Sequence, residues 1–199
     1  MSFDFIQETG KMIIFTAPSG AGKTTIVRHL LKTFDFLDFS VSATTRPQRD
    51  HEIDGRDYFF KTPEEFSAMI LNDELAEWEE VYPNRYYGTL NSEVDRIWNS
   101  GKHIVFDIDV KGAVNLSERY GTQCLSVFIK PPSLDALIER LTKRKTETPE
   151  SLARRTQKAE MELTFEPLFD TVLINDELEV ALKNAEMIVQ SFIFGSEEE

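Results

Sequence analysis

With 199 residues, 41% of them hydrophobic and 15 of them phenylalanine, the chain can bury the core of one ordinary domain, which excludes wholesale disorder. Its formal net charge of −13 argues against duplex DNA or another nucleic acid as the partner, because phosphate-backbone binding requires a basic surface. The sequence has neither a run of 18 apolar residues nor a leader-like N-terminus, so we expect no membrane span and no secretion signal.

The first predicted element is a short buried strand in the apolar half of residues 12–25, which read MIIFTAPSGAGKTT. Helical spacing follows it, at Ile26, Val27, Leu30, Leu31 and Phe34. Between them lies a Gly-rich turn, the setting in which backbone N–H groups converge on phosphate oxygens at a helix N-terminus. We predict a phosphate-binding loop in which Lys23 reaches the β- and γ-phosphates and Thr24 offers a hydroxyl to Mg²⁺. Its residues are Ala17, Pro18, Ser19, Gly20, Ala21, Gly22, Lys23, Thr24 and Thr25.

One position of this loop departs from the usual pattern, G-x-x-x-x-G-K-[ST], because Ala17 stands where Gly is expected. A Cβ atom there matters only if the backbone needs a positive φ, at a cost of about 1–2 kcal/mol, or if the site has no room for a methyl group. Ala17 lies at the exit of the strand, before the amides of residues 20–25 that would surround a phosphate. We therefore expect the alanine to leave the loop intact.

The next section, between about residues 40 and 89, is polar and aromatic, with turn signals at Asp54-Gly55 and Pro83-Asn84. Two short strands and one helix are predicted in it, at 40–45 (SVSATT), 56–60 (RDYFF) and 63–73 (PEEFSAMILND). This pattern favours an inserted α+β sub-domain over a further layer of the core.

Strands and helices then alternate to the end of the chain, which indicates βαβ units and a parallel sheet. The predicted strands are 102–109 (KHIVFDID), 124–130 (CLSVFIK) and 170–175 (DTVLIN), and the predicted helices are 91–100, 133–144, 149–165 and 178–193. The single Cys124 lies in one of these strands and can form no intrachain disulfide. It is expected to be a buried small hydrophobe in a protein of the reducing cytoplasm.

Two acids end the predicted strand 102–109. Asp107 and Asp109 alternate with Ile108, so both side chains can lie on one face at the carboxyl end of the strand, where parallel sheets bind ligands. A carboxylate there can hold Mg²⁺ directly or through water, and we predict a magnesium site at Thr24 and Asp107. The alternative is that one of the two acids only caps the following turn.

Basic residues are clustered in this acidic chain. The clusters are Arg46 with Arg49, Arg140 with Arg144, and Arg154 with Arg155; the last lies in a polar insert, about 143–155, that also holds Lys143 and Lys145. Arg140 and Arg144 are four residues apart, so on a helix they share a face and can converge on one anion. Phosphoryl transfer needs such a clamp, because charge spreads over the equatorial oxygens in the transition state. For any single arginine the alternative is a solvated surface charge.

In this order the pieces resemble guanylate kinase, from about residue 11 to residue 194. SVSATTRPQRDHEIDGRDYFF resembles the GMP-binding segment of that family and RYYGT its next segment, while FDIDVKG, PPS, RLTKRKTET and INDEL recur in family order. The resemblance implies an α/β P-loop nucleoside monophosphate kinase with a parallel sheet flanked by helices. Its parts would be a core (10–36, 90–142 and 156–195), a GMP-binding sub-domain (37–89), a lid (143–155) and an acidic tail (196–199).

The same resemblance implies Mg²⁺-dependent, direct in-line transfer of the γ-phosphoryl group from ATP to GMP, giving ADP and GDP as the lid and sub-domain close. It adds Arg140, Arg144 and Asn175 to the loop as ATP contacts. It assigns GMP to Ser42, Arg46, Arg49, Tyr58, Glu77, Tyr87, Thr89, Asp109 and Arg155. The groups that would stabilise the transferring phosphoryl are Lys23, Arg46, Arg140, Arg144 and Arg155.

The assignment of Glu77 also makes chemical sense by itself. Guanine presents N1–H and N2–H₂ as adjacent donors, which one carboxylate can accept together. Adenine has an acceptor at N1, so the same carboxylate would be left badly paired.

Two other functions deserve comparison with this one. A guanylate-kinase-like interaction module would bind a phosphopeptide without catalysis, but such modules typically lack an intact phosphate loop and have flanking domains for which we expect no room here. A kinase for another nucleotide or a sugar phosphate is the second, and Glu77 with Ser42 and Thr89 favours guanine over it. Two further departures from the family pattern are Lys145, where the family usually has Gly, and a longer EEVYPNRYYG segment.

We expect the protein to be a monomer or a small homo-oligomer.

Overall fold

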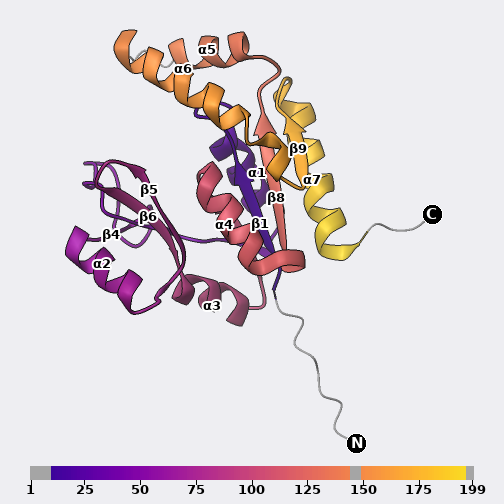
Figure 1. The fold of residues 1–199 in the computed structure, drawn as a ribbon. Helices are drawn as coiled ribbons and strands as arrows, with labels where there is room; N and C mark the ends of the chain where they lie inside the picture. Colours follow the sequence, from indigo (N-terminus) through magenta and orange to yellow (C-terminus); the bar gives the residue numbers. More distant parts are fainter. Residues whose placement is uncertain (1–9, 144–148, 196–199) are drawn as a thin grey trace, which may run out of the picture.

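A computed structural model describes residues 10–143 and 149–195 (Figure 1). Its larger sheet is parallel throughout, with strand order β2-β7-β1-β8-β9. These strands are β1 (Met12–Thr16), β2 (Leu37–Phe39), β7 (His103–Asp107), β8 (Cys124–Lys130) and β9 (Thr171–Ile174). The helices packed with them are α1 (Lys23–Thr33), α3 (Asn91–Asn99), α4 (Val110–Tyr120), α5 (Leu134–Thr142), α6 (Pro149–Leu163) and α7 (Leu178–Phe194). The predicted α/β core is confirmed.

The central strand β1 is buried along its whole length and serves both faces of the sheet. Because successive side chains of a strand point to opposite faces, Ile13 and Phe15 pack into one hydrophobic cluster, with α1 and α7. Met12 and Ile14 pack into the other cluster, with α3 and α4. Across the described residues, no helix has the length and apolarity that crossing a bilayer requires.

A second, four-stranded sheet lies beside the core, with strand order β4-β3-β6-β5 (Figure 1). Its elements are β3 (Ala43–Thr44), β4 (Phe59–Phe60), α2 (Pro63–Leu71), β5 (Leu75–Tyr82) and β6 (Arg85–Leu90). Thr62 begins α2 with a capping box, since its hydroxyl accepts from the Glu65 amide and the Glu65 carboxylate accepts from the Thr62 amide. The unit mixes strands with a helix, as the sequence pattern indicates, but its two longest strands, β5 and β6, were not among the predicted elements.

Several elements besides β5 and β6 differ from the sequence-based expectation, and the short strand β2 was also not predicted. Helix α4 was not predicted, because Gly112 and polar residues interrupt its short apolar face. The predicted strand 102–109 ends at Asp107, since Asp109 already begins α4. The polar insert 143–155 is helical from residue 149, so its end lies inside α6, and the proposed lid includes the first turns of a helix. Two 3₁₀ turns, η1 (Gly121–Gln123) and η2 (Glu166–Leu168), complete the described chain.

Candidate active site

The phosphate loop joins β1 to α1 with two residues in the left-handed region. Gly20 has a φ of 97° and Gly22 a φ of 101°, conformations that favour glycine at both positions. Ala17 has no positive φ, and its side chain, 7% exposed, packs with Ala21 in the core. The expectation that the alanine does not strain the backbone is confirmed.

Lys23 and Thr24 lie in the first turn of α1 and meet the end of the neighbouring strand β7. The Lys23 Nζ atom is 2.7 Å from Asp107 Oδ1 and donates to the Ile108 carbonyl at 2.8 Å. The Thr24 hydroxyl donates to Asp107 Oδ2 at 3.2 Å. One carboxylate thus holds both the lysine of the loop and the hydroxyl predicted to face Mg²⁺.

Two adjoining cavities lie along this edge of the sheet. The phosphate loop lines a cavity of about 380 Å³, which Lys158 and Glu162 of α6 complete from the far side. A smaller one, of about 160 Å³, lies between the core and the second sheet. Lys23, Tyr58 and Asp109 line both, so the two spaces share a wall. Two ligands bound here would have neighbouring ends.

Five of the residues assigned to GMP line the smaller cavity: Ser42, Tyr58, Glu77, Tyr87 and Asp109. Four of them lie in the second sheet or directly before its strands, and Asp109 is the N-cap of α4. Thr89, also assigned to GMP, lies opposite Glu77 in the β5–β6 pair, and its hydroxyl donates to Glu77 Oε1 at 2.8 Å. The structure therefore brings six predicted residues together around one space.

The Glu77 carboxyl group is the most perturbed acid of this cavity. Burial raises its pKa to about 7 against the opposing hydrogen bond from Thr89, and the negative charges of Asp109 and Glu79 raise it further. Hydrogen-bond donors of a bound ligand would stabilise the ionised form of this buried carboxyl group. Perturbed groups of this kind are typical of functional sites.

Asp109 has a structural contact as well as a place in the cavity wall. Its Oδ1 atom accepts from the amides of Lys111 and Gly112, at 2.9 and 3.2 Å, and so caps the N-terminus of α4. Asp109 therefore caps the next element, as the alternative from the sequence states, but it does not only cap, because it also lines both cavities.

Arg46 and Arg49 flank the same region but do not line the smaller cavity among its described residues. Arg46 is only 8% exposed, and its guanidinium forms a two-pronged ion pair with Glu52, at 2.7 and 2.5 Å. The Cζ atom of that guanidinium lies 4.8 Å from the centre of the Tyr58 ring, which does line the cavity. Arg49 donates its amide to Glu52 Oε2 at 2.8 Å, while its side chain is 65% exposed.

Glu52 was not identified from the sequence as part of the site. Its hydrogen bond with Arg46 lowers its pKa to about 2, against a smaller opposing effect of burial. The only signal in the sequence is an acid six residues after Arg46 and three after Arg49 in a loop, a spacing too common to be informative.

Asn175 and Arg140 hold the far end of the phosphate loop. Asn175 is 5% exposed and donates its side-chain amide to the Ala21 carbonyl at 2.7 Å. Arg140 Nη2 donates to the carbonyls of Asn175 and Asp176, at 2.9 and 3.2 Å. With Gly22 these residues line a further space of about 240 Å³ beside the loop. Arg144, predicted to act with Arg140, lies outside the described residues.

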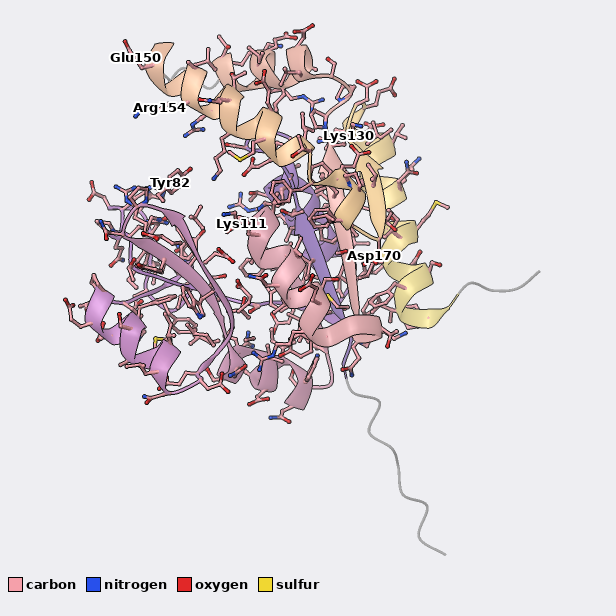
Figure 2. The ribbon with its side chains drawn as sticks, in the orientation of Figure 1. Tyr82, Lys111, Lys130, Glu150, Arg154 and Asp170 are labelled. Atoms are coloured by element: carbon pink, nitrogen blue, oxygen red, sulfur yellow. The ribbon has the colours of Figure 1, made fainter. Side chains whose placement is uncertain are left out.

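A cleft of about 390 Å³ separates α6 from the β5–β6 hairpin. Figure 2 shows Arg154 on α6, Tyr82 on the hairpin and Lys111 at the start of α4 around this opening, and all three line it. Arg155, assigned to GMP from the sequence, lies next to Arg154 on α6 and is not among the described residues that line the cleft.

Contacts across the cleft were not predicted. Lys158 of α6 lies 4.6 Å from the centre of the Tyr82 ring, a cation–π contact with the hairpin. Lys158 also pairs with Glu162 at 3.6 Å. Burial raises the pKa of the Glu162 carboxyl, and the positive charges of Lys158 and Lys23 oppose that rise. The Lys158–Tyr82 contact joins segments that are distant in sequence, so no local pattern could have shown it.

Comparison with known proteins identifies the family. The family model for guanylate kinase matches residues 9–192. The chain is 49% identical over 191 residues to the guanylate kinase of Bacteroides thetaiotaomicron, covering 96% of this chain and 94% of that one. It is 44% identical over 184 residues to that of Porphyromonas gingivalis, with 92% and 98% covered. The crystal structure of guanylate kinase from Anaplasma phagocytophilum superposes with a TM-score of 0.73 at 26% identity, over 94% of this chain and 88% of that one. The chain belongs to the guanylate kinase family.

Proposed function

We propose that this chain transfers the γ-phosphoryl group of ATP to GMP directly and in line, with ATP on the phosphate loop and GMP in the smaller cavity. The observation that carries the proposal is the shared wall: Lys23, Tyr58 and Asp109 line both spaces, which sets the two ligands end to end. Direct transfer requires that arrangement, because catalysis of this reaction is mostly positioning and charge stabilisation.

On the donor side, the amides of residues 17–25 would surround the ATP phosphates at the N-terminus of α1. Lys23 would leave Asp107 for the β- and γ-phosphates, since its 2.7 Å ion pair lies at the edge of the phosphate cavity. Arg140 would add positive charge near the loop, with Arg144 and Arg155 completing the clamp from the lid. Asn175 would contact the adenine side, next to the Gly22 end of the loop.

On the acceptor side, Glu77 would accept the guanine N1–H and N2–H₂ groups, with Thr89, Ser42 and Asp109 around the base. The Glu77–Thr89 hydrogen bond of 2.8 Å supports this role because it fixes one carboxylate oxygen and leaves the group facing the cavity. The GMP phosphate would be bound by Arg46 and Arg49, together with the hydroxyls of Tyr58 and Tyr87. Arg46 is held in place for this contact by Glu52.

The residues present fit a magnesium ion at Thr24 and Asp107. Both offer hard oxygen atoms and already lie within 3.2 Å of each other. In the described ranges no cluster of three acidic, histidine or cysteine residues forms a protein-only metal site, which suits an ion that takes most ligands from phosphates and water. When bound, Mg²⁺ would neutralise charge on the β- and γ-phosphates.

Closure of the lid and the GMP-binding sub-domain would exclude water from the transfer. The cleft of about 390 Å³ between α6 and the hairpin is the space available for that movement. We propose residues 37–89 as the GMP-binding sub-domain that moves and residues 143–155 as the lid.

The acceptor preference tests the proposal. ADP release from ATP is measured with GMP, AMP, CMP and UMP at equal concentrations, with each acceptor omitted in turn as the blank. We expect GMP to be used at least tenfold better than any other acceptor, because a carboxylate rejects the N1 acceptor of adenine. Preference for another acceptor would overturn the assignment of Glu77, and no turnover with any of them would overturn the activity.

A further inference from the structure

Helix α4 of the core lies along strand β5 of the second sheet, and three of its residues face that strand. Gly112, Asn115 and Arg119 follow at intervals of three and four, so they share one face of the helix. The Asn115 side chain donates to Glu79 Oε1 at 2.7 Å. Arg119 donates to the carbonyls of Ala76 and Leu75, at 2.7 and 3.3 Å. These bonds fix the height of β5 against α4 on both sides of Glu77.

At the level of Glu77 the helix has no side chain. Gly112 is buried, and a Cβ atom added to it would lie 2.7 Å from Glu77 Oε2, a distance at which something must shift. The other carboxylate oxygen, Oε1, is held by the Thr89 hydroxyl. The Glu77 carboxylate therefore fills a slot between Thr89 and the bare Cα of Gly112.

Backbone conformation does not explain this glycine. Gly112 lies in the first turn of α4 and is not among the glycines with positive φ. In a helix, alanine is favoured over glycine because it loses less backbone entropy on folding. The position would gain stability from a methyl group if packing were the only consideration.

We propose that Gly112 is a specificity-determining positioning residue, which acts by leaving the room in which the Glu77 carboxylate faces the guanine edge. This inference rests on the proposed role of Glu77 in reading the base. The nearest atoms to an added methyl group are the far end of a flexible side chain, so the carboxylate moves and the backbone does not. Adding a methyl group at this position should therefore weaken recognition of the base without destabilising the fold.

The test is Gly112→Ala, compared with Gly121→Ala at the other end of the same helix. Gly121 has a φ of 52° and no atom within 4 Å of an added Cβ. For Gly112→Ala we expect kcat/KM for GMP to fall roughly 10- to 100-fold with the KM for ATP unchanged, since charged hydrogen bonds to the base are lost. Its melting temperature should stay level or rise by about 1–4 °C. For Gly121→Ala we expect the opposite: a lower melting temperature and unchanged preference for GMP over AMP.

A double variant separates a clash with Glu77 from a general disturbance. Glu77→Asp shortens the side chain by one methylene and also misplaces the carboxylate. If both single changes act on the position of that group, Gly112→Ala with Glu77→Asp should be no worse toward GMP than the worse single variant. Multiplying losses would overturn the inference, as would a Gly112→Ala enzyme with wild-type preference for GMP.

Glu77→Ala distinguishes failure of the inference from failure of the proposed function. If Glu77→Ala loses the preference for GMP and Gly112→Ala keeps it, the role of Gly112 is wrong and that of Glu77 stands. If Glu77→Ala itself keeps the preference, the base is read elsewhere and both assignments fall.

Discussion

The donor and acceptor regions of this enzyme are built in different ways. The proposed donor region is one stretch of nine residues whose backbone would bind the phosphates, shaped by two glycines with positive φ. The acceptor region draws single side chains from residues 42 to 109, held at their places by the packing of two sheets and α4. A local loop tolerates change around it, whereas an assembled cavity depends on contacts such as that between Gly112 and Glu77.

The two regions also use charge differently. In the donor region Lys23 is already paired with the Asp107 carboxylate. Glu77, in contrast, has a pKa of about 7 because it is buried, so its charge depends on the pH of the solution. The donor region should therefore respond to loss of a side chain, and the acceptor region to small changes of position and of pH.

Removing Lys23 should give the largest effect. Lys23→Ala takes away the cation predicted to stabilise the transferring phosphoryl group, and we expect kcat to fall on the order of 10³-fold or more. Binding of GMP, measured by calorimetry without ATP, should change little, because the base is read on the acceptor side. Near-normal turnover would contradict the role of the lysine and would erase the contrast between the two regions.

The two regions should differ in how KM depends on pH, by a factor of about ten. Only ionised Glu77 can accept both guanine donors, so KM for GMP should rise about tenfold between pH 8 and pH 6, as the group protonates around pH 7. KM for ATP should change much less over this range. The matched control is Glu77→Gln, whose weaker GMP binding should keep only the small pH dependence that the GMP phosphate group, with a second pKa of about 6, brings to both enzymes. A wild-type profile as flat as that of the variant would contradict the assignment.

The same titration acts on folding with the opposite sign. The pKa of Glu77 is higher in the folded chain than its ordinary value, so the folded state binds more protons between about pH 4.5 and pH 7. This group therefore contributes stability at low pH that is lost as the pH rises through 7. As the pH rises through 7, GMP binding should therefore improve while the contribution of Glu77 to the stability of the fold is lost.

Loosening Arg46 should give a smaller effect on the acceptor side. Glu52→Gln removes the charge that holds the guanidinium, and we expect KM for GMP to rise roughly three- to tenfold with kcat nearly unchanged. Asp57→Asn is the control, because it breaks the exposed ion pair with Arg56 in the same segment. Steady-state kinetics on both variants decide the question. Equal effects would mean that the segment, and not Arg46, had been disturbed.

The smallest effect is expected at Ala17. Ala17→Gly restores the usual residue of the loop, but Ala17 has no positive φ and packs in the core. We expect the affinity for ATP, measured by calorimetry, to change less than about twofold. A tenfold gain would show that the methyl group obstructs the donor loop and that this region tolerates substitution less well than we propose.

The sequence is sufficient for the donor loop because the loop is local. Strand, glycines, lysine and helix follow one another, and the structure keeps that order. In the acceptor region the residue types pointed to GMP only through a family resemblance, since Ser42, Tyr58 and Glu77 have no common spacing. Their meeting depends on strand pairing and on the packing of α4, which was not predicted. The Tyr82–Lys158 contact was missed for the same reason, and Glu52 was missed because its spacing from Arg46 is too common to be informative.

Both key cations of the site are paired in advance, Lys23 with Asp107 and Arg46 with Glu52. At Lys23 an incoming phosphate group would therefore exchange places with a tethered carboxylate, whereas at Arg46 it would join a guanidinium that Glu52 already holds in place. A free inorganic anion would bring only its own charge and oxygen atoms to the Lys23 exchange, whereas a nucleotide would also bring the contacts of its base and ribose.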